Sequence, residues 1–162
     1  MATDPNSSVT QAPTGARKTA RGMARLAAVQ ALYQMDLTQL EATAVISQFT
    51  QHRFGEAAHY DQADKRFFTD LVLGVVRAQR IVDPLIAKHL ALGWRLGRID
   101  SILRAILRSA AYELQERHDV PLKVIINEYV DMAHAFFGRE EPGVVNGILD
   151  AIAREVRGGE LG

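Results

Sequence analysis

Residues 120–153 read VPLKVIINEYVDMAHAFFGREEPGVVNGILDAIA, and this stretch decides the fold. Its first part carries apolar side chains three and four residues apart, the spacing of a helix that is buried along one broad face. These side chains are Val124, Ile125, Tyr129, Met132, Ala133 and Phe136. A break over residues 138–143, rich in Gly and charge, precedes a second periodic run that begins at Val144. We therefore expect two helices that form a hairpin.

The same helical spacing recurs earlier in the chain, and no segment shows the sustained alternation typical of a strand. It predicts helices over residues 17–35, 39–50 and 61–83 and from Asp100 to about residue 117. Asp100 is a good N-cap, and Asp83–Pro84 predicts a bend followed by a separate short helix over residues 85–92. The sequence thus predicts an all-α fold of about seven helices around one core.

Length and composition fit a single domain. The chain has 162 residues, of which 48% are hydrophobic and 23% charged, and no cysteine. No apolar run reaches the roughly 18 to 20 residues that span a bilayer, and no secretory pattern opens the chain, so we expect a cytoplasmic protein. Residues 1–16 include Pro5, Pro13 and Gly15 and have almost no large apolar side chain, which predicts a disordered tail. The domain then covers residues 17–157, with a C-terminal tail over residues 158–162.

Residue patterns disfavour catalysis. The five histidines are scattered without metal-ligand spacing, and no serine has the setting of a nucleophile. No Gly-rich phosphate loop follows a strand. We therefore expect no catalytic residue, no metal and no cofactor, and we do not expect an enzyme.

The charge distribution points to a basic N-terminal face. Formal net charge is zero, but no acid lies between Asp4 and Asp36. Helical geometry places the four cations of this region, Arg17, Lys18, Arg21 and Arg25, within an arc of about 100°. Such a face is either a solvated helix surface or a contact for nucleic-acid phosphates, and the lack of neighbouring acids favours phosphates.

Two polar pairs in the decisive stretch have structural explanations. Glu128 lies near a core face, so we expect Glu128 or Asn127 to bond backbone groups of the following element. Asn146 can cap a helix start, and Gly147 permits a close helix approach.

Four segments carry a family resemblance. VIINE at 124–128, with Val130, Ala133 and Phe137–Gly138, is similar to the VAINExVxxAxxFG pattern of the NusB family, and VNGILD at 145–150 is similar to its VNGVLD. The segment 102–114, ILRAILRSAAYEL, resembles the family's ILRxAxYEL. Arg25 with AVQALY at 28–33 resembles its RxxAVQALY opening. The resemblance covers roughly residues 17–157.

This resemblance implies two packed helical halves and a role in transcription antitermination. Family proteins bind the boxA element of nascent ribosomal RNA together with a small-subunit ribosomal protein acting as NusE, and so load an antitermination complex with other Nus factors on RNA polymerase. The RNA lies against the basic N-terminal helix, which makes Arg17, Lys18, Arg21 and Arg25 the RNA-binding candidates here. Family proteins occur as monomers and as homodimers.

Two further regions are candidates through the resemblance. The loop with Glu140, Glu141 and Val144 is a possible RNA or partner contact, although Val144 replaces the Phe that the family commonly has and the loop is one residue shorter. Tyr112 and Glu113 are candidates for partner binding.

Two other functions remain open. The same domain occurs at the N-terminus of ribosomal RNA cytosine methyltransferases. This chain ends at Gly162 without room for a catalytic domain, so that function would require a truncated protein. The alternative is a helical protein-interaction module without RNA affinity.

Overall fold

A computed structural model describes residues 19–53 and 63–161, and every regular element in these ranges is a helix. The α-helices are α2 (Ala20–Thr38), α3 (Ala42–Gln48), α5 (Lys65–His89), α6 (Ser101–Glu116), α7 (Leu122–Phe136), α8 (Glu141–Val156) and α9 (Gly158–Leu161). A π-helical turn, η1 (Phe49–Arg53), follows α3. The predicted all-α fold of about seven helices is confirmed, whereas the tail predicted over residues 1–16 lies outside the described residues.

Side-chain caps start three of the helices. Thr19, Asp64 and Asp100 precede α2, α5 and α6, and each accepts a backbone N–H of the first turn at 2.8 or 2.9 Å. Such caps satisfy donors that the helix itself leaves unpaired. The predicted capping role of Asp100 is therefore confirmed.

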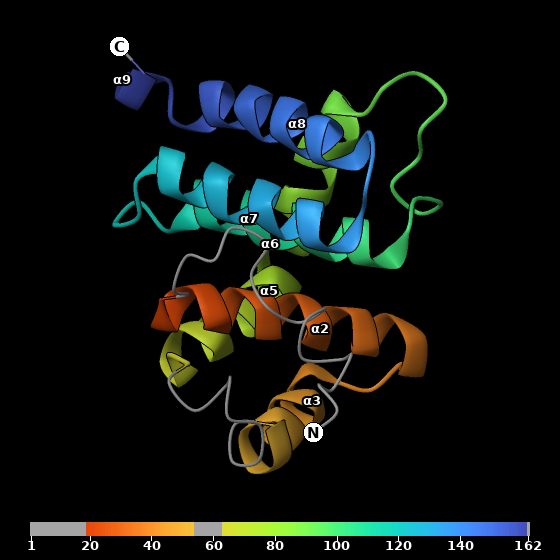
Figure 1. Ribbon diagram of the computed structural model, residues 1–162, viewed down its shortest axis with the longest axis vertical. Coiled ribbons are helices and arrows are strands. Elements are labelled where there is room, and N and C mark those ends of the chain that lie inside the picture. The colour runs from red at the N-terminus through yellow and green to blue at the C-terminus, as the bar shows by residue number, and fades with distance from the viewer. Residues whose placement is uncertain (1–18, 54–62, 162) are drawn as a thin grey trace, which may run out of the picture.

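The helices form two packed halves (Figure 1). α6, α7 and α8 pack together in the upper half, and α2 packs with α3 in the lower half. α5 runs behind both halves and packs against α2, α3, α6 and α8. The predicted arrangement in two halves is confirmed, and both α5 and direct packing of α2 on α6 join them.

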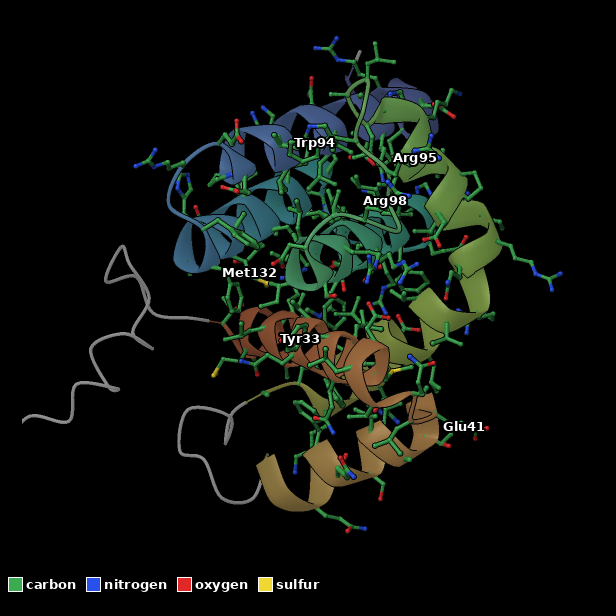
Figure 2. The ribbon with its side chains drawn as sticks, turned by 90° about the vertical axis from the view of Figure 1, so that its right-hand side faces the viewer. Tyr33, Glu41, Trp94, Arg95, Arg98 and Met132 are labelled. Atoms are coloured by element: carbon green, nitrogen blue, oxygen red, sulfur yellow. The ribbon has the colours of Figure 1, made fainter. Side chains whose placement is uncertain are left out.

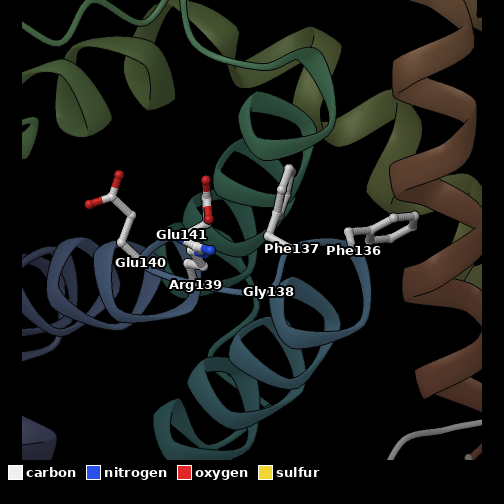
Figure 3. Close-up of a pocket in the computed structure, with 6 residues that line it drawn as sticks. All are labelled: Phe136, Phe137, Gly138, Arg139, Glu140 and Glu141. Carbon is white, nitrogen blue, oxygen red and sulfur yellow. The ribbon is translucent and has the colours of Figure 1, made fainter.

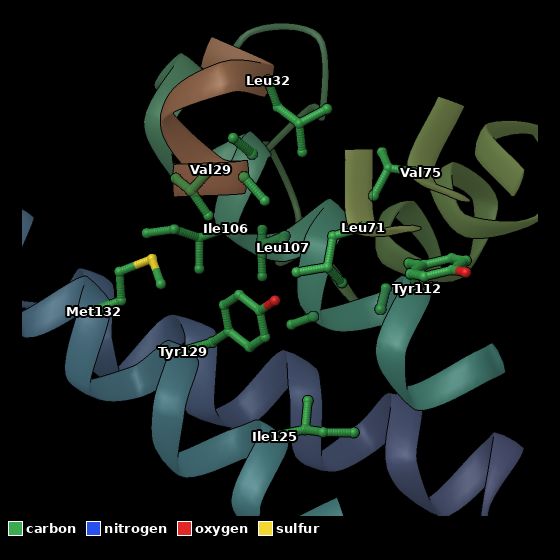
Figure 4. Packing of buried hydrophobic residues seen from close by; sticks show 14 of the residues in the cluster. Val29, Leu32, Leu71, Val75, Ile106, Leu107, Tyr112, Ile125, Tyr129 and Met132 are labelled. Carbon is green, nitrogen blue, oxygen red and sulfur yellow. The ribbon is translucent and has the colours of Figure 1, made fainter. Parts of the chain in front are cut away.

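One core continues from the lower half into the upper half (Figure 4). Val29 of α2, Leu71 of α5, Ile106 of α6 and Tyr129 of α7 all lie in it and are at most 1% exposed. Burial of such side chains stabilises a domain by about 25 cal/mol per Å² of apolar surface. The core thus fixes the position of α2 relative to α6 and α7.

α7 and α8 form the predicted hairpin. Ile148 and Leu149 of α8 are 5% and 0% exposed, and Ile125 of α7 is fully buried. The expectations for the neighbouring pair are wrong: Asn146 and Gly147 lie exposed inside α8, and a Cβ at Gly147 would meet no atom within 4 Å. Neither residue caps a helix or permits a close approach.

α5 contradicts the predicted separate helix after Asp83–Pro84, because a single helix continues through Pro84 to His89. Asp83 does not cap a new helix, since its carboxylate accepts hydrogen bonds from Nε and Nη2 of Arg108 at 2.9 and 2.8 Å. Val82 and Ile86 are fully buried on either side of the proline. Packing therefore overrides the local preference for a break.

Candidate nucleic-acid interface

Among the four basic residues predicted to bind RNA, Arg21 is the exposed one within the described residues. It lies in the first turn of α2, and its side chain is 42% exposed. Arg17 and Lys18 lie outside the described residues. A contact of these three side chains with RNA stays a prediction.

The guanidinium of Arg21 is held by one aromatic ring and two carboxylates. It lies over the ring of Phe67 at 4.5 Å from the centroid, a cation–π geometry. Its Nη1 is 3.5 Å from Oδ2 of Asp119, and its Nε is 3.8 Å from Oδ2 of Asp64. Both ion pairs are long and half-exposed, so they hold the side chain loosely.

The expectation that Arg25 lies on an exposed basic face is wrong. The residue is 2% exposed, and its Nε and Nη2 donate to Oε2 and Oε1 of Glu113 at 2.8 and 3.0 Å. Its Nη1 donates to Oε1 of Glu128 at 3.1 Å. Burial alone would lower the pKa of Arg25, but Glu113, with smaller effects from Tyr129 and Glu128, offsets burial and leaves that pKa raised. A buried guanidinium with these partners stabilises the packing of α2 and is not exposed to RNA.

Glu128 therefore has a different partner from the one expected. Its carboxylate accepts from the side chain of Arg25 in α2, whereas we expected a backbone partner. Glu113 also accepts from the hydroxyl of Tyr129 at 2.6 Å. Burial, and then the negative charge of Glu113, raise the pKa of Tyr129. We call Arg25, Glu113, Glu128 and Tyr129 the buried network; it ties α2 to α6 and α7.

Tyr112 and Glu113 are buried, so neither can offer the direct partner contact that the resemblance implied. They are 2% and 0% exposed. The hydroxyl of Tyr112 donates to the carboxylate of Asp70 at 3.1 Å, and a Cβ added at Gly74 would lie 2.2 Å from Cζ of the Tyr112 ring. Tyr112 thus packs α6 closely against α5.

Arg117 and Asp119 are site residues that the sequence did not single out. Arg117 follows α6 and lies over the Phe67 ring at 4.9 Å, and it donates to Asp70 at 3.0 Å. Its Nε and Nη2 each donate to Asp119 at 3.0 Å. Hydrogen bonds from Arg117 lower the pKa of Asp119 to about 2. Arg21 and Arg117 thus share one carboxylate and one aromatic ring.

The loop that contains Glu140 and Glu141 lines an open hollow of about 660 Å³ (Figure 3). Glu140 is exposed, whereas Glu141 and Val144 are half-buried. Phe136 is 37% exposed at the edge of the hollow, and Phe137 lies beside it with ring centroids 6.5 Å apart. Exposed Arg139 lines the same hollow, so the loop places one cation beside the two acids, while Phe136 at the end of α7 points away from them in Figure 3.

A second exposed basic segment lies between α5 and α6 (Figure 2). Arg95 and Arg98 are exposed there, and Trp94 is half-buried against the core. This segment lies at the opposite side of the molecule from the first turn of α2 in Figure 1. The two exposed basic regions can therefore be tested separately.

The described residues offer no metal site or membrane span. Within residues 19–53 and 63–161, no group of three His, Cys, Asp or Glu side chains could hold a metal ion. No helix in the described part of the chain is long and apolar enough to cross a membrane.

Comparisons with known proteins agree on one family. A family model described as the NusB family matches residues 23–154. A transcription antitermination protein NusB from Bradyrhizobium sp. (strain ORS 278) is 50% identical over 155 residues, which cover 94% of this chain and 92% of that protein. A protein of the same name from Nitrobacter hamburgensis is 53% identical over 144 residues, which cover 87% of this chain and 90% of that protein.

Solved structures share the fold. The structure of T. maritima NusB matches with a TM-score of 0.71 at 28% identity, covering 90% of this chain and 99% of that one. The solution structure of NusB from Aquifex aeolicus matches with a TM-score of 0.65 at 25% identity, covering 83% of this chain and 88% of that one.

Proposed function

Because the chain belongs to the NusB family of transcription antitermination proteins, we propose that it binds the boxA element of nascent ribosomal RNA together with the ribosomal protein that acts as NusE. In this role it helps to load an antitermination complex on RNA polymerase in the cytoplasm. The same membership confirms the prediction that the chain is not an enzyme.

The exposure of the Arg21 side chain is the observation that supports an RNA contact. Its guanidinium is half-exposed in the first turn of α2, three residues after Lys18 and four after Arg17 in sequence. Single-stranded RNA is held by phosphate contacts and by stacking of its bases. A guanidinium that lies on an aromatic ring can keep that contact while its N–H groups meet a phosphate.

Arg25 is a positioning residue in this proposal. Its bonds to Glu113 and Glu128 fix the first two turns of α2 against α6 and α7. They therefore hold Arg21, one turn earlier on the same helix, at a constant place on the surface.

The loop over residues 138–141 has two acids and one cation, Arg139, and this excess of negative charge suits a protein partner better than RNA. Glu140 is an exposed carboxylate, and Glu141 is half-buried beside it. Carboxylates repel phosphates but attract the cations of a ribosomal protein. We propose that Glu140 and Glu141 face the protein partner, with Phe136 and Val144 as the apolar part of the same contact.

Binding of labelled RNA tests the proposal. Fluorescence anisotropy would compare a single-stranded oligonucleotide carrying boxA with a scrambled one, each with and without the ribosomal protein. We expect boxA to bind at least about tenfold more tightly than the scrambled sequence when the partner is present, a difference of roughly 1.4 kcal/mol. Equal affinity for both oligonucleotides, or no binding to either, would refute boxA recognition.

A further inference from the structure

Three guanidiniums surround the ring of Phe67. Those of Arg21, Arg25 and Arg117 lie 4.5, 5.0 and 4.9 Å from its centroid. The carboxylates paired with them belong to Asp64, Asp70, Glu113, Asp119 and Glu128. Within this cluster three positive charges therefore meet five negative ones, so neighbouring carboxylates offset the charge of Arg21.

Arg21 is the loosely paired member of this cluster. Its contacts with Asp119 and Asp64 are 3.5 and 3.8 Å long, whereas Arg117 donates twice to Asp119 at 3.0 Å. Asp119 keeps both bonds to Arg117 when Arg21 changes partner. Release of Arg21 consequently breaks only long, half-exposed contacts, which are weak.

We propose that Asp119 and Asp64 occupy Arg21 in place of RNA phosphates, so that RNA binding exchanges these carboxylates for a phosphate and the two acids limit RNA affinity. The inference rests on the proposed RNA contact of Arg21. Carboxylates and phosphates accept from the same guanidinium fork, which makes the exchange chemically conservative. The remaining negative charge also repels phosphates that Arg21 does not capture, and this weakens binding to unrelated RNA.

Charge-removing variants of the two acids test this exchange. Asp119→Asn and Asp64→Asn would be titrated with the labelled boxA oligonucleotide at several salt concentrations. Asn is as good an N-cap as Asp, so Asp64→Asn preserves the start of α5. Glu116→Gln is the matched control, because Glu116 is an exposed acid three residues before Asp119. Thermal melting of each variant checks that it is folded.

We expect Asp119→Asn and Asp64→Asn each to tighten RNA binding about two- to fivefold, the range of a half-exposed ion pair. Glu116→Gln should change affinity by less than about twofold. In an Arg21→Ala background the gain from Asp119→Asn should disappear, since the guanidinium that the proposal releases is absent. The gain should also be smaller at high salt, because screening weakens exposed pairs.

Three results would overturn the exchange. Unchanged or weaker binding by both folded Asn variants, while Arg21→Ala still weakens RNA binding, refutes competition but leaves the proposed function intact. A gain in RNA affinity that persists in the Arg21→Ala background would assign the effect to Arg117 or to the lower overall negative charge of the surface. Binding that responds neither to Arg21→Ala nor to the Asn variants refutes the proposed RNA contact itself.

Discussion

Two arginines one helical turn apart on α2 have opposite environments. Arg21 is 42% exposed in its side chain and has ion pairs of 3.5 and 3.8 Å. The side chain of Arg25 is 3% exposed and has hydrogen bonds of 2.8, 3.0 and 3.1 Å. Glu113 and Tyr129 create the difference, because they reach Arg25 from α6 and α7. One guanidinium is thus committed to the fold, and the other has only long, half-exposed ion pairs.

The largest effect is expected from breaking the buried network at Arg25. Arg25→Met should destabilise the protein by about 3–5 kcal/mol, because it leaves the Glu113 carboxylate buried without its cation. Urea unfolding followed by circular dichroism measures this loss. The double variant Arg25→Met with Glu113→Gln should recover part of it, since no buried charge then remains. A loss below about 1 kcal/mol for the single variant would mean that water reaches Glu113.

A smaller effect is expected at Tyr129, which donates to Glu113 at 2.6 Å from a fully buried position. Tyr129→Phe removes the hydroxyl but keeps the ring, so it should cost about 1–3 kcal/mol. The same unfolding measurement applies. Tyr33→Phe, a matched change at a half-buried tyrosine of α2, should cost less. Equal losses of unfolding free energy for Tyr129→Phe and Tyr33→Phe would mean that the buried network contributes no extra stability through the Tyr129 hydroxyl.

Arg21 should matter least for stability. Arg21→Ala loses only long, half-exposed ion pairs and the contact with Phe67, so its free energy of unfolding should stay within about 0.5 kcal/mol of the parent. A loss comparable to that of Arg25→Met would place both arginines in one structural cluster and erase the contrast between them.

Much of the fold could be predicted because its signals are local. The apolar spacing around Ile125 and Leu149 predicted the hairpin, and Asp100 predicted the start of α6. Both features depend on side chains within a few turns of each other. The prediction of a separate helix after Pro84 was wrong because the decisive partner of Asp83, Arg108, lies 25 residues away in sequence.

The candidate site could be predicted only in part. Helical geometry grouped Arg25 with Arg21, but whether a cation is exposed depends on the helices that cover it. One signal was present in the sequence: Glu113 and Glu128 lie within apolar runs, and buried carboxylates require a cation. Asp119 and Phe67 gave no such signal, since their contacts with Arg21 join segments about 50 to 100 residues apart.

The salt dependence of RNA binding tests most directly whether Arg21, unlike Arg25, contacts RNA. If Arg17, Lys18 and Arg21 contact phosphates, the log–log salt slope for the boxA oligonucleotide should have a magnitude of about 2, and Arg21→Ala should lower it by about 0.7. Arg98→Ala, in the exposed basic segment between α5 and α6, should leave both slope and affinity unchanged. An unchanged slope for Arg21→Ala with a lower one for Arg98→Ala would contradict the RNA contact on α2 and move it to that segment.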